Sequence, residues 1–146
     1  MSRIVVFGAA GKAGSRVVAE AAARGHEVTA VARDIARLGH LPEGVRPVAG
    51  DVTDTEAVAA LAEEADALVL TVGGPDAGLY TEAVDSVAAA VRALGPKGPR
   101  IVHMGGGASL LNEDEVRYFA PPVPGGVQAV RRRADPGPRR LPDARR

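Results

Sequence analysis

The sequence has no cysteine and no tryptophan, and only two tyrosines and two phenylalanines among its 146 residues. Without cysteine there is neither a disulfide framework nor a thiolate metal site. The three histidines, His26, His40 and His103, are too scattered to indicate a cluster of metal ligands. No apolar run reaches the roughly 20 residues that cross a bilayer, and no basic-then-apolar leader precedes the first predicted strand. A cytoplasmic protein is therefore expected.

The chain also lacks a net charge, because 18 Lys or Arg balance 18 Asp or Glu. The balance conceals two different parts. Residues 1–120 carry 11 basic and 16 acidic side chains, whereas residues 121–146 carry seven Arg and two Asp. A basic tail can contact nucleic acid, but this one has no aromatic side chain to stack on bases. Nucleic acid is therefore not the expected partner.

Glycine is abundant, and three glycines follow the first apolar run at a fixed spacing. The run Ile4–Phe7 leads directly into residues 8–14, Gly-Ala-Ala-Gly-Lys-Ala-Gly, and a helix-forming stretch follows. In such a turn the first glycine permits the sharp bend, the second lets the backbone approach a pyrophosphate, and the third lets the helix pack on the strand. The helix N-terminus then favours the negative phosphates. This order predicts a dinucleotide-binding site.

The spacing G-x-x-G-x-x-G differs from that of a P-loop. Ala13 follows Lys12 where a P-loop requires Ser or Thr, and Val6 occupies the position of its first glycine. The alternative is an ordinary strand-to-helix turn of an α/β protein, which three glycines at this spacing disfavour.

Strand and helix patterns alternate along the following residues. Helices are expected over 12–24, 53–64 and 79–94, and further strands over 27–32, 45–49, 67–71 and 100–104. This alternation predicts a Rossmann-type α/β fold, a doubly wound parallel sheet with strand order 3-2-1-4-5 that is incomplete at its C-terminal side. Ligand should bind beyond the carboxyl ends of the first and fourth strands, where the winding direction reverses.

Several local features are also expected. Thr53 should cap the helix 53–64, with Glu56 completing a capping box. The strand 100–104 is apolar enough to be buried on both faces. His103 within this strand should pack rather than titrate. The unpaired edge of the strand would favour association. In the helix 79–94, one apolar stripe should face the sheet: Val84, Val87, Val91 and Leu94.

Further candidate binding residues follow the other strands. Arg33 stands where many NAD enzymes place an acidic residue for the ribose 2′-hydroxyl, so it favours NADP(H) over NAD(H), although the adjacent Asp34 could reverse this preference. Asp51 could accept from the adenine amino group with Val52 beside the ring; a turn aspartate before the next helix is the alternative. Residues 71–73 would lie under the adenosine ribose. The candidate cofactor-binding residues are Gly8, Ala10, Gly11, Lys12, Ala13, Gly14, Arg33, Asp51, Val52, Thr71, Val72 and Gly73.

The fifth predicted strand leads into a glycine-rich segment, residues 105–109, which is expected near the nicotinamide. Ser109 is the one hydroxyl there that could polarise a carbonyl or hold the carboxamide. It is the candidate catalytic residue, and a loop serine without a role is the alternative.

Three segments, IVVFGAAGKAGSRVVAEAAARGHEVTAVARD, VAGDVTD and IVHMGGGASLLN, together resemble the atypical short-chain dehydrogenase/reductase family, in particular its NAD(P)H-binding flavin-reductase-like and NmrA-like branches. The resemblance covers about residues 3–117. It implies a Rossmann fold and an NADPH-dependent oxidoreductase with a flavin or quinone-like acceptor. It also allows a non-catalytic NADP sensor, because NmrA-like members bind the cofactor without turning it over. It implies NADP binding through Gly8, Gly11, Gly14, Arg33 and Asp51.

The acid–base pair of general short-chain dehydrogenases, a Tyr with Lys at the fourth position after it, is missing. Tyr80 is followed at that spacing by Val84, and Tyr118 by Pro122. Alcohol oxidation by a tyrosinate and nucleotide-sugar epimerisation are therefore disfavoured. Hydride transfer to a flavin or quinone needs less, because the acceptor can take its proton from water and the protein need only align the rings.

Two regions are therefore expected: an NAD(P)-binding Rossmann domain over residues 1–117 and an irregular Arg/Pro-rich tail over residues 118–146. Residues 120–146 hold six prolines and show no helical or strand periodicity. The family continues after its fifth strand with another helix and further strands, and a reading frame shifted by one nucleotide can encode such a helix here. We therefore hypothesise a frameshift near codon 119, which the coding DNA would test. A natural disordered basic tail is the alternative.

Overall fold

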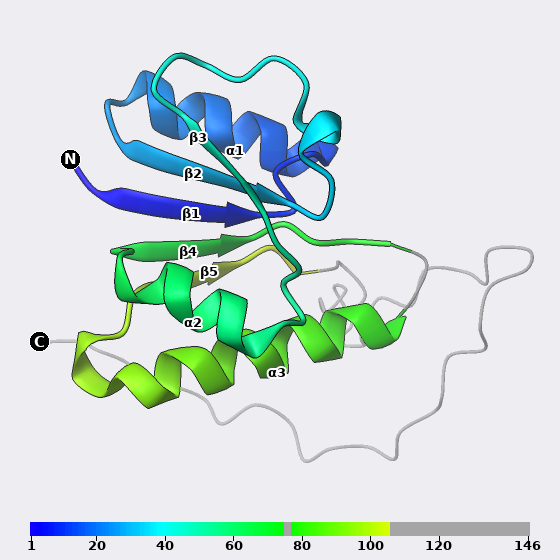
Figure 1. The fold of residues 1–146 in the computed structure, drawn as a ribbon, viewed down its shortest axis with the longest axis vertical. Helices are drawn as coiled ribbons and strands as arrows, with labels where there is room; N and C mark the ends of the chain where they lie inside the picture. The colour runs from blue at the N-terminus through cyan, green and yellow to red at the C-terminus, as the bar shows by residue number, and fades with distance from the viewer. Residues whose placement is uncertain (75–76, 106–146) are drawn as a thin grey trace, which may run out of the picture. The chain divides into compact units, whose positions relative to one another are not determined.

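A parallel five-stranded sheet forms the centre of the protein in the computed structural model (Figure 1). Its strand order is β3-β2-β1-β4-β5, as predicted. The structure describes residues 1–74 and 77–105, so Ser109 and the predicted boundary at residue 117 lie outside the described residues. The strands are β1 Arg3–Phe7, β2 Glu27–Ala32, β3 Arg46–Ala49, β4 Ala67–Leu70 and β5 Arg100–His103.

Helices cover the sheet from both sides. Figure 1 shows α1 on one side of the sheet, and α2 and α3 together on the other. Because β1 lies between β2 and β4, the links from β1 to β2 and from β3 to β4 run in opposite directions along the sheet. The helices are α1 Lys12–Ala23, α2 Thr55–Glu63 and α3 Ala77–Leu94, with short 3-10 turns η1 Ile35–Leu38 and η2 Gly95–Lys97.

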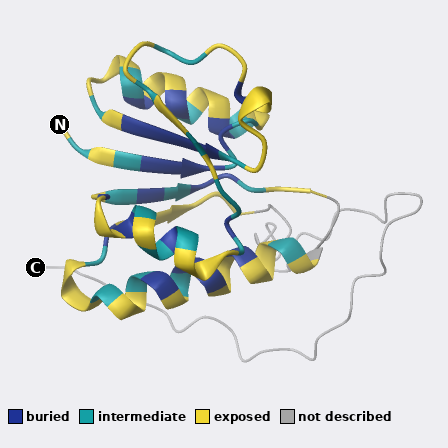
Figure 2. Ribbon diagram, in the orientation of Figure 1, coloured by how far each residue is buried: buried dark blue, intermediate teal, exposed yellow. Residues whose placement is uncertain are grey.

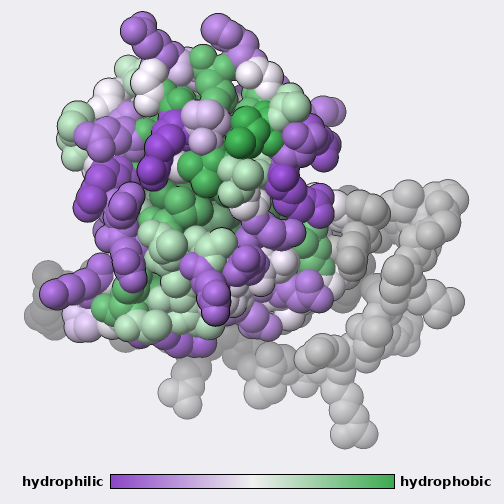
Figure 3. Space-filling model, in the orientation of Figure 1, coloured by the Kyte–Doolittle hydropathy of each residue, from purple (hydrophilic) through white to green (hydrophobic). Residues whose placement is uncertain are grey.

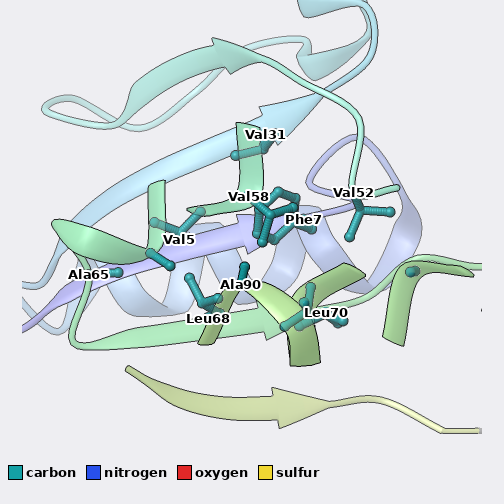
Figure 4. Packing of buried hydrophobic residues seen from close by; sticks show 12 residues of the cluster. Val5, Phe7, Val31, Val52, Val58, Ala65, Leu68, Leu70 and Ala90 are labelled. Atoms are coloured by element: carbon teal, nitrogen blue, oxygen red, sulfur yellow. The ribbon is translucent and has the colours of Figure 1, made fainter. Parts of the chain in front are cut away.

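The larger core cluster lies between the sheet and the pair α2–α3 (Figure 4). Phe7 and Leu70 come from β1 and β4, and each is 1% exposed. Val58 of α2 and Val87 of α3 pack against them with exposures of 0% and 1%. These helices therefore hold the central strands at the end where the glycine turn begins.

The opposite face of the sheet packs on α1. Val6 points to this side because alternate strand residues face opposite ways, and Val18 of α1 meets it. Both side chains are almost fully buried, and Figure 2 shows the buried inner stripe of α1 and the exposed outer one. The first strand is thus buried on both faces, as its continuous apolar run predicts.

The face of α3 that meets the sheet differs from the predicted one. Val84 is 40% exposed, whereas Ala83 and Ala90 are almost fully buried. Only the later part of the predicted stripe, Val87 with the partly buried Val91 and Leu94, packs as expected. The small Ala83 and Ala90 occupy the buried positions in the core cluster that α3 shares with α2, and Val84 lies on the exposed side of the helix.

The N-cap of α2 is Asp54, not Thr53 as predicted. The Asp54 carboxylate accepts hydrogen bonds from the N–H groups of Glu56 at 3.1 Å and Ala57 at 3.2 Å. Thr53 instead donates its own N–H and hydroxyl to the carboxylate of Asp51. The helix consequently begins at Thr55, two residues later than expected.

The prediction that β5 is buried on both faces is wrong. Ile101 and Val102 point to opposite faces of the sheet, yet they are 42% and 49% exposed. His103, expected to pack within the strand, is exposed as well. Within the described residues β5 pairs only with β4, and it contributes no side chain to either buried core cluster.

The surface in Figure 3 shows hydrophilic side chains around the margin of the viewed face and apolar ones between them. Among residues 1–74 and 77–105, no helix combines the length and the apolar character needed to span a membrane. The same residues contain no group of three or more His, Asp or Glu side chains arranged to hold a metal ion.

Candidate functional site

An open cleft of about 210 Å³ lies at the carboxyl ends of the strands β1, β2, β3 and β4. This is the edge where the winding direction of the sheet reverses, which is the expected place for a ligand in an open α/β sheet. Nine of the twelve predicted binding residues line the cleft: Gly8, Ala10, Gly11, Arg33, Asp51, Val52, Thr71, Val72 and Gly73.

The other three predicted residues, Lys12, Ala13 and Gly14, are not part of the cleft lining; they form the first turn of α1. Seven further residues line the cleft; Asp34 was considered together with Arg33, and sequence reasoning missed the other six. Three of them, Phe7, Ala32 and Gly50, directly precede a predicted residue, so strand ends alone would have indicated these three. The additional lining residues are Phe7, Val31, Ala32, Asp34, Arg37, Gly50 and Leu79.

The turn after β1 requires glycine at its first position. Gly8 has a φ of +78°, a conformation that residues with a Cβ rarely adopt. A Cβ at Gly8 would also lie 2.9 Å from both the carbonyl carbon and the carbonyl oxygen of Thr71. The turn is closed by the N–H of Gly11, which donates to the carbonyl of Gly8 at 2.9 Å.

Gly14 is buried beneath this turn. A Cβ at Gly14 would overlap the carbonyl oxygen of Gly8, lie 2.7 Å from the hydroxyl oxygen of Thr71 and 2.8 Å from the Cα of Ala9. Gly11 is less restricted, because a Cβ there would approach only the Gly8 oxygen, at 3.2 Å. Gly14 thus has the role predicted for the third glycine, which is close packing of the helix on the strand.

Thr71 ties the end of β4 to the glycine turn. Its buried hydroxyl donates to the carbonyl of Phe7 at 2.8 Å and lies 3.3 Å from the carbonyl of Gly8. Its backbone N–H donates to the same Phe7 carbonyl at 3.0 Å. That Thr71 lies under an adenosine ribose stays a prediction; the hydrogen bonds show that it holds the two central strands together at the cleft.

Among the residues that the structure describes, no side chain caps the N-terminus of α1. Gly11 occupies the N-cap position and makes no side-chain hydrogen bond, whereas Asp54 caps α2. The first N–H groups of a helix have no acceptor within the helix itself. The first turn of α1, next to the cleft-lining Gly11, therefore presents donors and a positive dipole end that can accept an anion.

Two arginines line the cleft after β2. Arg33 follows the strand directly, and Arg37 follows one turn later in η1; both are exposed. Asp34 lies between them and also lines the cleft, but its carboxylate accepts from the N–H of Ala36 at 3.0 Å and caps η1. Arg37 was missed because its place at the cleft depends on the 3-10 turn η1, which the sequence analysis did not predict.

Asp51 lines the part of the cleft that follows β3. One carboxylate oxygen, Oδ1, accepts from the N–H of Thr53 at 3.0 Å and from its hydroxyl at 2.9 Å. The alternative that the sequence left open, a turn aspartate before the next helix, is therefore observed for Oδ1 of Asp51. The backbone hydrogen bond from Thr53 lowers the pKa of Asp51 below its ordinary value, and the Thr53 hydroxyl and the Arg33 charge lower it further against the opposing effect of burial.

This shift gives Asp51 a predicted effect on acid stability. Because the pKa is lower in the folded chain, the carboxylate contributes stability above its unfolded pKa, and this is lost as the pH falls through the folded pKa. We expect the free energy of unfolding of the wild type to decrease more steeply below pH 3.8, the ordinary value, than that of Asp51→Asn. Urea unfolding of both proteins at a series of acidic pH values measures this difference, and parallel curves would contradict it.

Val52 and Val72 form the apolar part of the cleft. Val52 is 6% exposed and belongs to the core cluster between the sheet and α2–α3, and Val72 packs against that cluster. Both line the cleft, so one side of each is available to a flat apolar group. The cleft thus combines an anion-binding end at the glycine turn, two cations after β2 and an apolar wall.

Known proteins of similar sequence or structure include reductases. The 3-diazoavenalumate denitrifying reductase of a Streptomyces species is 33% identical over 151 aligned positions, which cover 88% of this chain and 48% of the reductase. A candidate NADH-flavin reductase from Streptococcus pneumoniae superimposes with a TM-score of 0.61 at 25% identity, covering 79% of this chain and 52% of that protein.

A candidate epimerase from Bacteroides thetaiotaomicron superimposes with a TM-score of 0.68 at 28% identity, again covering 79% of this chain and 52% of the other. This chain thus spans about half the length of each of these three proteins. The model of the NAD(P)H-binding family matches residues 8–122, a range that holds the glycine turn and all the other residues of the cleft except Phe7. The chain belongs to this NAD(P)H-binding family.

Proposed function

We propose that the cleft binds NADP(H) and that the chain is the cofactor-binding part of an NADPH-dependent reductase whose acceptor is a flavin or a quinone-like compound. The observation that carries the proposal is the arrangement of the cleft. A glycine turn at an uncapped helix N-terminus and two arginines after β2 line one continuous space, with the apolar Val52 and Val72.

The glycine turn supports binding of the pyrophosphate. Gly8 and Gly11 let the backbone approach the ligand closely, and the N-terminus of α1 offers N–H donors that no side chain occupies. Lys12, in the first turn of α1, adds a positive charge near this end. The adenine would then lie toward Asp51 and Val52. The second oxygen of Asp51, Oδ2, is available to accept from an amino group, because the hydrogen bonds from Thr53 go to Oδ1.

The preference for NADP(H) rests on Arg33 and Arg37. NADP carries a doubly negative phosphate at the 2′ position, where NAD has a neutral hydroxyl. Arginine side chains recognise a phosphate well. Asp34 also lines the cleft, and one of its carboxylate oxygens, Oδ1, accepts from the N–H of Ala36 at 3.0 Å. Its other oxygen remains to accept from a 2′-hydroxyl, so the proposed preference requires the two arginine charges to outweigh this one carboxylate.

The reductase assignment draws on the residues and on the relatives. Two of the three similar proteins are named as reductases, one acting on 3-diazoavenalumate and one as an NADH-flavin reductase. A bound nicotinamide would supply the hydride, and the protein would need to orient the ring and keep water away from it. No Lys follows Tyr80 at the spacing needed for an acid–base pair, which disfavours an epimerase.

Replacing Arg33 tests the cofactor preference. We expect Arg33→Ala to raise the Kd for NADPH roughly 10- to 100-fold, because a charge-assisted bond to phosphate is lost, and to leave the Kd for NADH nearly unchanged. Titration of the purified chain with each cofactor, followed by nicotinamide fluorescence, measures both constants. Arg24→Ala is the matched control, because Arg24 is exposed and pairs with Glu20 away from the cleft.

The results of the titration separate the possible failures. Tighter binding of NADH than of NADPH by the wild type would overturn the role given to Arg33. Absence of saturable binding of either cofactor would overturn the proposal for this chain. Binding of NADPH without its oxidation by flavin or quinone acceptors, even when the chain is joined to a complete family-like C-terminal part, would favour the cofactor sensor instead of the reductase.

A further inference from the structure

Tyr80 reaches back from the beginning of α3 to the loop that precedes the helix. Its hydroxyl accepts a hydrogen bond from the N–H of Gly74 at 3.2 Å and is placed to donate to the carbonyl of the same residue at 3.4 Å. Both polar groups of one glycine are therefore bound by a single side chain. A phenol can make this pair of contacts because its oxygen both donates and accepts.

The loop that Tyr80 holds forms part of the cleft. Gly73 lines the cleft beside Val72, and a Cβ built on Gly73 would lie only 3.2 Å from the Tyr80 hydroxyl oxygen. Leu79, the residue before Tyr80, lines the same cleft from α3. The beginning of α3 thus contributes one side chain to the wall of the cleft and uses the next to fix the adjoining backbone.

Two successive glycines need such a constraint. Gly73 and Gly74 have no Cβ, so the backbone at these positions has more accessible conformations than at any other residue type, and ordering it costs more entropy. Both residues are exposed, and neither contributes to a buried core cluster. The hydroxyl of Tyr80 therefore supplies an ordering contact that packing does not provide.

We propose that Tyr80 is a positioning residue for cofactor binding: its hydroxyl holds Gly73 and Gly74 in the conformation that receives the adenosine ribose. This inference rests on the proposed NADP(H) site, because it assigns to that site a residue that does not itself line the cleft. The side chain acts through the loop, and the tyrosine is not required to exchange a proton.

The experiment compares Tyr80→Phe with the wild type. The variant keeps the ring and loses both hydrogen bonds, so the amide of Gly74 should exchange its hydrogen faster while the midpoint of thermal unfolding stays nearly unchanged. We expect the Kd for NADPH to rise about threefold to tenfold, as the loss of neutral hydrogen bonds predicts. The Kd for 2′,5′-ADP, which carries only the adenosine half, should rise by the same factor.

Val84→Ala is the control, because Val84 is a similarly exposed residue one turn further along α3. It should change neither the exchange at Gly74 nor the two dissociation constants. Unchanged exchange in Tyr80→Phe would overturn the proposal, and so would faster exchange with wild-type affinity for both ligands. If the wild type binds neither ligand, the proposed function fails and this positioning role fails with it, while the exchange at Gly74 still shows whether the hydroxyl orders the loop.

Discussion

Gly14→Ala should destabilise the protein by about 3 kcal/mol or more, because the added methyl group has no space and its neighbours cannot move aside. The Cβ would overlap the Gly8 carbonyl oxygen and approach the Ala9 Cα at 2.8 Å, and both belong to the backbone of the turn. The remaining contact, 2.7 Å to the Thr71 hydroxyl, involves a buried side chain that already bonds the Phe7 carbonyl. Urea unfolding measures the loss directly.

Two other glycines provide matched controls for Gly14→Ala. Gly11→Ala should cost clearly less than Gly14→Ala, because Gly11 has a φ of −80° and its Cβ would approach only the Gly8 carbonyl oxygen, at 3.2 Å. Gly25→Ala adds strain without a clash, because Gly25 has a φ of +77° with nothing within 4 Å, and we expect a cost of about 1 kcal/mol. A Gly14→Ala protein as stable as Gly11→Ala would contradict the close packing of α1 on β1.

Phe7→Ala should have the second large effect, about 3–5 kcal/mol, because a large and almost fully buried side chain is removed from the main core cluster. Phe7 also lines the cleft and directly precedes Gly8. The cavity left by the ring should let the turn relax, so the affinity for NADPH should fall as well. Denaturant unfolding and cofactor titration measure the two effects.

Leu68→Ala separates stability from binding. Leu68 is fully buried in the same cluster but is not part of the cleft lining, and its replacement should cost about 2–5 kcal/mol. Under conditions in which both variants remain folded, only Phe7→Ala should show a higher Kd for NADPH. Equal losses of affinity in both would mean that Phe7 affects binding only through global stability.

The strand order and the glycine turn could be predicted because they depend on local patterns. Ile4–Phe7 is a continuous apolar run, and the three glycines follow it at a spacing that few structures other than a phosphate-binding turn require. The alternation of strands and helices then restricts the topology strongly, because crossovers between parallel strands are right-handed.

The errors concern choices that only packing decides. Thr53 and Asp54 are both good N-cap residues, and the contact of Thr53 with Asp51 leaves the cap to Asp54. In α3, valines at helical spacing indicated one face, while the small Ala83 and Ala90 are buried and Val84 is exposed. The apolar residues of β5 identified a strand, but burial depends on neighbours that a strand pattern does not specify.

The site was predicted in part for the same reason. Residues at strand ends, such as Arg33 and Asp51, could be located from the sequence because parallel strands end at one edge. Arg37 and Tyr80 could not, because the place of Arg37 depends on the conformation of η1, and that of the Tyr80 hydroxyl on the return of a side chain from α3 to the loop before it.

If the proposed cofactor binds at the N-terminus of α1, folding is coupled to metabolite concentration. Asp54 provides α2 with its cap within the chain, whereas Gly11 offers no side-chain acceptor to the first N–H groups of α1, which an anion in the turn would engage. A ligand that binds only the folded form adds stability by mass action, about 2.7 kcal/mol at a concentration one hundred times its Kd. The lifetime of this protein in a cell would then follow the local supply of reduced and oxidised dinucleotide, independently of any reaction that it catalyses.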